Sequence, residues 1–128
     1  MKMNVLVDSY GWIEYFTNGP LANKYAKYIE TANKAEYFVS PVMLYEVYKK
    51  IKTIKNEQTA LEAVAQIMTY TTVIDLDGSI ALEAADLSIK YGLGFVDATI
   101  KATAESKKAA LITSDKHFKG LNNVILLG

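Results

Sequence analysis

Four acidic residues are the side chains whose type and position could do chemistry. Asp8 and Asp115 each follow a short apolar run, and Asp97 stands at the start of a helical pattern. Glu46 lies in a segment rich in apolar and aromatic residues. Carboxylates gathered at one site repel one another unless a cation neutralises them. Mg²⁺ and Mn²⁺ prefer oxygen ligands and leave positions for water and phosphate, so the set indicates metal-assisted hydrolysis of a phosphodiester.

Each acid also has a purely structural explanation when it is taken alone. Asp8, Asp97 and Asp115 each precede a predicted helix, and Asp is a preferred N-cap residue. Glu46 can pair with a lysine three or four residues later, which stabilises a helix by only about 0.2–0.5 kcal/mol. The chemical interpretation therefore depends on the fold bringing the four acids together.

Hydroxyl residues and a single histidine stand beside these acids. Ser9, Thr113 and Ser114 are the supporting candidates, because a hydroxyl can orient a carboxylate or a water, although a Thr-Ser pair before Asp is also ordinary turn chemistry. His117 is interpreted as an exposed loop residue or a partner of local backbone, because a metal-binding histidine normally has companions at a known spacing.

Lysines and tyrosines also lie near the acids in the sequence. Tyr10, Tyr45 and Tyr48 could stack on unpaired bases, yet at helical spacing such rings more often belong to a core or a subunit interface. Every basic residue is lysine, so an arginine in the active site would have to come from a partner. Four lysines flank the acids and could contact the phosphates of a substrate, although a solvated helix face is the commoner place for lysine: Lys49, Lys50, Lys101 and Lys116.

The composition is that of one globular domain. The 128 residues carry 14 basic and 14 acidic side chains, so no global positive field recruits nucleic acid. The absence of cysteine excludes a disulfide framework and a thiolate metal site. No apolar run reaches the ~20 residues of a membrane span, and Asp8 comes too early for a signal-peptide core. We therefore expect a cytoplasmic protein that does not enter a membrane.

Short β-branched runs alternate with longer segments of helical spacing, which predicts an α/β fold with a parallel sheet covered on both faces. Ligands of such sheets bind beyond the carboxyl ends of the strands, where Asp8 and Asp115 would meet if the first and fourth strands are neighbours. Strands are predicted at residues 5–7, 37–39, 72–74, 110–112 and 124–127, and helices at 10–16, 21–32, 41–53, about 57–68, 78–90 and 98–106, with a short turn or helix at 115–118.

Four segments resemble the PIN-domain family, and within it the VapC-like toxins of toxin–antitoxin pairs. Each segment alone is a weak signal, but in this order they extend from residue 5 to about residue 127, so residues 1–128 are interpreted as one PIN domain. The segments are Val5-Leu6-Val7-Asp8-Ser9 with Trp12-Ile13, Val39-Ser40-Pro41 through Tyr45-Glu46-Val47, Leu93-Gly94-Phe95-Val96-Asp97-Ala98 with Ala102 and Ala104, and Thr113-Ser114-Asp115-Lys116-His117-Phe118, which fits the pattern Thr-x-Asp-x-x-Phe.

The resemblance implies a three-layer fold with a five-stranded parallel sheet, in strand order 3-2-1-4-5, flanked by helices. It also implies cleavage of single-stranded RNA with Mg²⁺ or Mn²⁺, a homodimer, and inhibition by a small antitoxin protein. By the same resemblance, Asp8, Glu46, Asp97 and Asp115 would ligate the metal or position its attacking water. The sequence departs from the family in having no arginine, so contacts to the RNA substrate would have to come from lysines.

Two other functions are compatible with the same residues. The domain could be a catalytically inactive module that binds RNA or protein, with its acids serving as caps and ion pairs. It could also be a different α/β phosphoryl-transfer enzyme with Asp8 as the phosphate acceptor. Against the latter, Asp8 lacks a second acid two residues later, and the sequence has no Gly-rich phosphate-binding loop.

Overall fold

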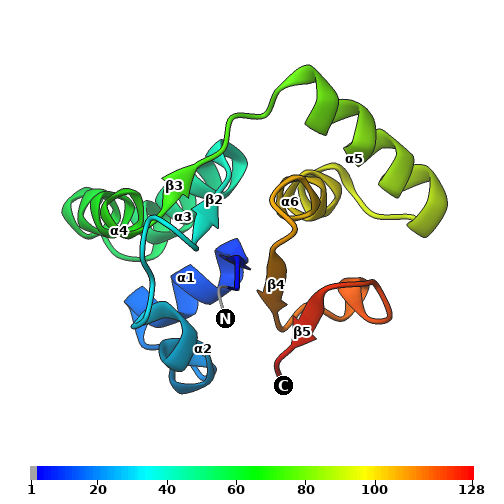
Figure 1. The fold of residues 1–128 in the computed structure, drawn as a ribbon. Coiled ribbons are helices and arrows are strands. Elements are labelled where there is room, and N and C mark those ends of the chain that lie inside the picture. The colour runs from blue at the N-terminus through cyan, green and yellow to red at the C-terminus, as the bar shows by residue number, and fades with distance from the viewer. Residues whose placement is uncertain (1–2) are drawn as a thin grey trace.

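The computed structural model describes residues 3–128, and Figure 1 shows the order of its elements. Met1 and Lys2 lie outside the described residues. They belong to the predicted domain and to the N-terminal segment that we did not expect to be a signal peptide. The strands are β1 (Val5–Val7), β2 (Phe38–Val39), β3 (Thr72–Val73), β4 (Ala110–Thr113) and β5 (Val124–Leu126). The helices are α1 (Ser9–Thr17), α2 (Ala22–Ile29), α3 (Pro41–Ile54), α4 (Glu57–Tyr70), α5 (Gly78–Tyr91), α6 (Phe95–Ser106) and the short 3₁₀ helix η1 (Lys116–Phe118).

The strands form two parallel ladders rather than one continuous sheet. β4 lies between β1 and β5, and β2 pairs with β3. A single parallel bridge between Val5 and Tyr37 links β1 to the residue before β2. The predicted α/β fold with parallel strands is confirmed. The predicted continuous five-stranded sheet in order 3-2-1-4-5 is wrong. Because β2 and β3 are only two residues long, β2 does not form a ladder of hydrogen bonds with β1.

Helices pack around the strands, and their small residues decide how closely they do so. In Figure 1, α1 to α4 lie on the left of the view, and α5 and α6 lie on the right with β4 and β5. β1 is fully enclosed, since its three residues are at most 2% exposed. Ala98, Ala102 and Ala104 are buried on α6, where their small side chains let that helix approach its neighbours.

A glycine sets the contact between α1 and α2. A Cβ added to Gly11 would lie 2.4 Å from Cε1 of Tyr25, which real atoms do not allow. The first turn of α1 can therefore press against the Tyr25 ring only because residue 11 has no side chain. Within residues 3–128, no helix has both the length and the apolar character required to cross a membrane.

Helix α6 begins earlier than predicted. The sequence pattern placed its start at Ala98 with Asp97 as the cap, but the helix begins at Phe95 and its N-cap is Gly94. Gly94 makes no side-chain capping bond, and Asp97 lies in the first helical turn. An acid there is favoured by the helix dipole without being used as a cap. The carboxylate of Asp97 is therefore free to face outward from the helix.

Candidate active site

A cleft of about 1140 Å³ brings all four predicted acids together. Asp8 comes from the junction of β1 and α1, Glu46 from α3, Asp97 from the first turn of α6, and Asp115 from the residue before η1. Ser9 and Ser114 line the same cleft. The carboxyl ends of the neighbouring strands β1 and β4 place Asp8 and Asp115 on the same side, as expected for parallel strands.

Asp8 is a capping residue and also a nearly buried carboxylate, only 4% exposed. Its Oδ1 accepts a hydrogen bond from the Gly11 N–H at 2.8 Å, which caps α1. Its Oδ2 accepts a hydrogen bond from the Thr113 hydroxyl at 2.6 Å. Burial nevertheless raises the pKa of Asp8 to about 6, since desolvation outweighs these hydrogen bonds and the nearby negative Asp115 adds to the rise. The capping interpretation of Asp8 is thus correct, but a cap alone is normally solvated.

Thr113 links two of the acids. Its side chain is fully buried, donates to Asp8 and accepts from the backbone N–H of Asp115 at 3.0 Å. The neighbouring Ser114 hydroxyl accepts from the Tyr25 hydroxyl at 2.9 Å. Burial and the nearby Asp8 carboxylate raise the pKa of Tyr25, which keeps that hydroxyl protonated as a donor. These contacts hold the turn after β4 against the start of α1.

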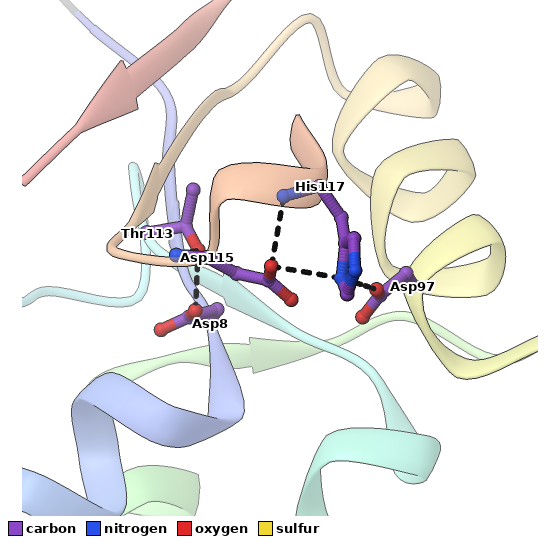
Figure 2. A network of polar contacts seen from close by, with 5 residues as sticks. All are labelled: Asp8, Asp97, Thr113, Asp115 and His117. Atoms are coloured by element: carbon purple, nitrogen blue, oxygen red, sulfur yellow. Dashed lines mark hydrogen bonds and ion pairs between the residues drawn. The ribbon is translucent and has the colours of Figure 1, made fainter. Parts of the chain in front are cut away.

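Asp97 and Asp115 meet at the imidazole of His117, as Figure 2 shows. His117 Nδ1 lies 3.0 Å from Oδ1 of Asp115 and 3.6 Å from Oδ2 of Asp97. The backbone N–H of His117 also donates to Asp115 Oδ1 at 2.9 Å, so Asp115 caps η1. Desolvation raises the pKa of Asp97, the negative Asp115 and Glu46 raise it further, and His117 opposes the rise. Asp97 and Asp115 therefore form a crowded pair of carboxylates at the mouth of the cleft.

Glu46 is fixed by one of the predicted supporting hydroxyls. The Ser9 hydroxyl donates to Oε1 of Glu46 at 2.6 Å. The expected pairing of Glu46 with Lys49 or Lys50 does not occur, since no such ion pair is found among residues 3–128. Ser9 thus aims the Glu46 carboxylate toward the α1 side of the cleft.

Three of the four predicted RNA-contacting lysines line the cleft, and the fourth does not. Lys49, Lys50 and Lys116 are exposed at its wall. The prediction for Lys101 is wrong, because its side chain is 3% exposed and its ammonium pairs with Glu105 and donates to the carbonyl of Asn122 at 2.7 Å. Lys101 joins α6 to the loop before β5, and phosphate cannot reach it there.

The tyrosines near the acids divide in the same way. Tyr10 and Tyr45 are 48% and 60% exposed and line the cleft, so neither lies in the core, and a place in a subunit interface stays a prediction for both. Tyr48 is partly buried against the hydrophobic core, as that interpretation expects. Lys49 lies over the Tyr45 ring at 5.4 Å from its centre, so charge and aromatic surface are adjacent on α3.

The donor chemistry of the cleft fits a hard divalent cation. Asp97, Asp115 and His117 each offer a ligand atom within 4.8 Å of the other two, and Asp8 and Glu46 face the same cleft. In the part of the chain that the structure describes, no ion pair joins a lysine to any of the four acids. Oxygen ligands predominate, as Mg²⁺ and Mn²⁺ prefer, so these residues could hold such an ion, whose charge would offset their repulsion.

Sequence reasoning underrated two residues of this site. His117 is exposed, as predicted, but it lies against two acids rather than only against local backbone. Its position two residues after Asp115 was the available signal. Tyr25 was not among the candidate residues, and nothing in its spacing indicates that its hydroxyl reaches Ser114, 89 residues later.

Several solved structures resemble this chain over nearly its whole length. A toxin–antitoxin complex from Klebsiella pneumoniae aligns at 25% identity with a TM-score of 0.78, covering 95% of this chain and 96% of that one. VapC20 of Mycobacterium tuberculosis, described as a sarcin-ricin loop cleaving toxin, aligns at 19% identity with a TM-score of 0.77, covering 94% and 97%. VapBC2 of Rickettsia felis, solved bound to a DNA fragment from its promoter, aligns at 16% identity with a TM-score of 0.73, covering 98% of each chain.

A comparison with curated protein sequences found no match. The likeness below 25% identity supports the fold, and the family follows from the sequence itself. Residues 5–123 match the PIN domain family. The matched segment extends from β1 to the loop before β5 and includes all four acids. The chain therefore belongs to the PIN domain family.

Proposed function

We propose that this PIN domain is an endoribonuclease that depends on Mg²⁺ or Mn²⁺ and cleaves single-stranded RNA, as the toxin of a toxin–antitoxin pair. The observation that carries the proposal is the buried charge of Asp8, which has no ion-pair partner among residues 3–128. Its carboxylate is nearly buried, has a pKa of about 6, and is therefore mostly charged at neutral pH. It opens on a cleft with three more acids, and no lysine of residues 3–128 pairs with any of them.

The residues of the cleft have separate roles in this proposal. A bound divalent ion would activate water for attack on phosphorus and offset charge on the phosphoryl oxygens. Asp97 and Asp115 would hold the ion together with Asp8, whose orientation is fixed by Thr113. Glu46, oriented by Ser9, would position the attacking water.

The walls of the cleft suit a single-stranded polynucleotide. Lys49, Lys50 and Lys116 would contact phosphates as point charges, and Tyr10 and Tyr45 would stack on unpaired bases. The even charge balance of the chain leaves attraction of RNA to these local groups.

The biological setting is part of the proposal. The named structural neighbours include toxin–antitoxin complexes, so we propose that a small antitoxin protein inhibits this chain in the cytoplasm. We also propose that the protein acts as a homodimer, as the family resemblance implied.

Cleavage of a single-stranded RNA pool by the purified protein tests the central claim. We expect cleavage with Mg²⁺ or Mn²⁺, none with EDTA, and a loss of about 100-fold or more in Asp97→Asn, because charge stabilisers at such sites contribute on that scale. Asp86→Asn is the matched control, since Asp86 is an exposed acid on α5 outside the cleft. Its cleavage rate should equal that of the wild type.

The same samples distinguish the inactive-module alternative. Undiminished cleavage in EDTA or in Asp97→Asn would contradict the proposed chemistry. Divalent-ion and RNA binding without any cleavage would instead support a binding module built on the PIN fold.

A further inference from the structure

His117 is a surface histidine that faces the acids of the cleft. Its ring is 78% exposed, yet Nδ1 points at two carboxylates from different elements, Asp97 of α6 and Asp115 before η1 (Figure 2). Ligands at right angles on an ion with bonds of about 2.1 Å stand about 3.0 Å apart. Nδ1 and Oδ1 of Asp115 are separated by 3.0 Å.

The backbone keeps the imidazole near the acids. The His117 N–H donates to Asp115 Oδ1, so the residue is fixed at the first turn of η1 by the carboxylate it faces. Phe118, the next residue, is buried and holds η1 in the core. The backbone of His117 is therefore fixed, and its side chain can move away from Asp97 and Asp115 only by rotation about its own bonds.

We propose that His117 supplies a nitrogen ligand to the divalent ion, and that this ligand makes the site prefer Mn²⁺ over Mg²⁺. The inference rests on the proposed function, since it concerns the ion of the same cleft. Both ions favour carboxylate and water oxygens, but Mn²⁺ belongs to the first-row series that also binds sites with nitrogen donors, at its weak end, whereas Mg²⁺ does not. A cluster of acids alone would not separate the two ions in this way.

The single histidine of the chain makes a direct test possible. In tag-free protein loaded with Mn²⁺, pulsed electron paramagnetic resonance detects ¹⁴N coupling from a bound imidazole, which His117 alone can supply. We expect this coupling in the wild type and in the control Lys119→Ala, whose exposed lysine lies outside the cleft. We expect the coupling to be absent in His117→Ala.

Ion affinities give a second readout that does not depend on RNA cleavage. Loss of His117 should weaken Mn²⁺ binding about tenfold and leave Mg²⁺ binding nearly unchanged. If His117 only orients the carboxylates, His117→Ala would weaken both ions equally, and ¹⁴N coupling would be absent from the wild type. Either result would overturn the inference while leaving the metal site intact. Absence of any Mn²⁺ binding to the wild type would overturn both the inference and the proposed function.

Discussion

Asp8 and Lys101 are both nearly buried charged residues, 4% and 2% exposed, but their surroundings are opposite. The Lys101 ammonium has a carboxylate partner in Glu105 and a carbonyl partner in Asn122. Asp8 accepts two hydrogen bonds, yet the nearest charge that affects its pKa is another acid, Asp115. Lys101 has a counter-charge within the protein, whereas no ion pair offsets Asp8 among the residues that the structure describes.

This difference separates a buried charge that has an ion-pair partner from one that has none. Ion pairs such as that of Lys101 hold elements in place, here α6 and the loop before β5. An uncompensated carboxylate costs stability, which a fold retains only where the group has another task.

Removing the Asp8 charge should stabilise the metal-free protein near neutral pH. A raised pKa means that the folded state binds the proton of Asp8 more tightly than the unfolded state does. The stability that this proton contributes is therefore fully present below the unfolded pKa of 3.8 and is lost as the pH rises through about 6. The loss amounts to about 3 kcal/mol at about 1.4 kcal/mol per pKa unit. Asp8→Asn keeps the cap acceptor and should abolish this loss, as urea unfolding in EDTA at several pH values would measure.

A flat pH profile in the wild type between those two pKa values would show that Asp8 is solvated or compensated. Asp86→Asn, which changes an exposed acid, provides the control for general charge effects.

Adding Mn²⁺ should recover the stability that Asp8 and its neighbours lose at neutral pH. At 100 times the dissociation constant, binding to the folded state alone contributes about 2.7 kcal/mol. Thermal or urea unfolding of the wild type, with and without the ion, measures this gain. Asp8→Asn should gain less, and an equal gain in that variant would mean that the ion binds elsewhere.

Breaking the other buried charge should destabilise the protein without affecting the ion. Lys101→Met keeps the aliphatic packing but leaves Glu105 without its partner and the Asn122 carbonyl without its donor. Because Glu105 is about one-third exposed, we expect a loss of about 2 kcal/mol, less than for a fully buried pair. Urea unfolding measures the loss, and calorimetry should give an unchanged Mn²⁺ affinity.

The double variant Lys101→Met with Glu105→Gln should regain part of that stability, because no unpaired carboxylate remains. If it is as unstable as Lys101→Met, the lysine contributes through packing rather than through its charge.

Local patterns predicted that Asp8 and Asp115 lie at one edge, because each residue follows a short-range rule. Asp8 ends a buried strand and Asp115 follows another, and neighbouring parallel strands then place both at one edge. Lys101 could not be predicted in this way, since its burial depends on Asn122, 21 residues later. The sheet was misjudged for a similar reason, because β2 joins β1 through one bridge, at Tyr37, that no strand propensity specifies.

The smallest expected effect belongs to Thr113, the residue that links the acids. Thr113→Val keeps its shape but removes the donor to Asp8 and the acceptor for the Asp115 N–H, costing about 1 kcal/mol in stability. Because the Thr113 hydrogen bond lowers the pKa of Asp8, its removal should raise that pKa further. Carboxyl NMR titration would follow the shift, and Thr113→Ser, which keeps the hydroxyl, should leave the pKa near its wild-type value. An unchanged pKa in Thr113→Val would mean that Thr113 orients the carboxylate without stabilising its charge.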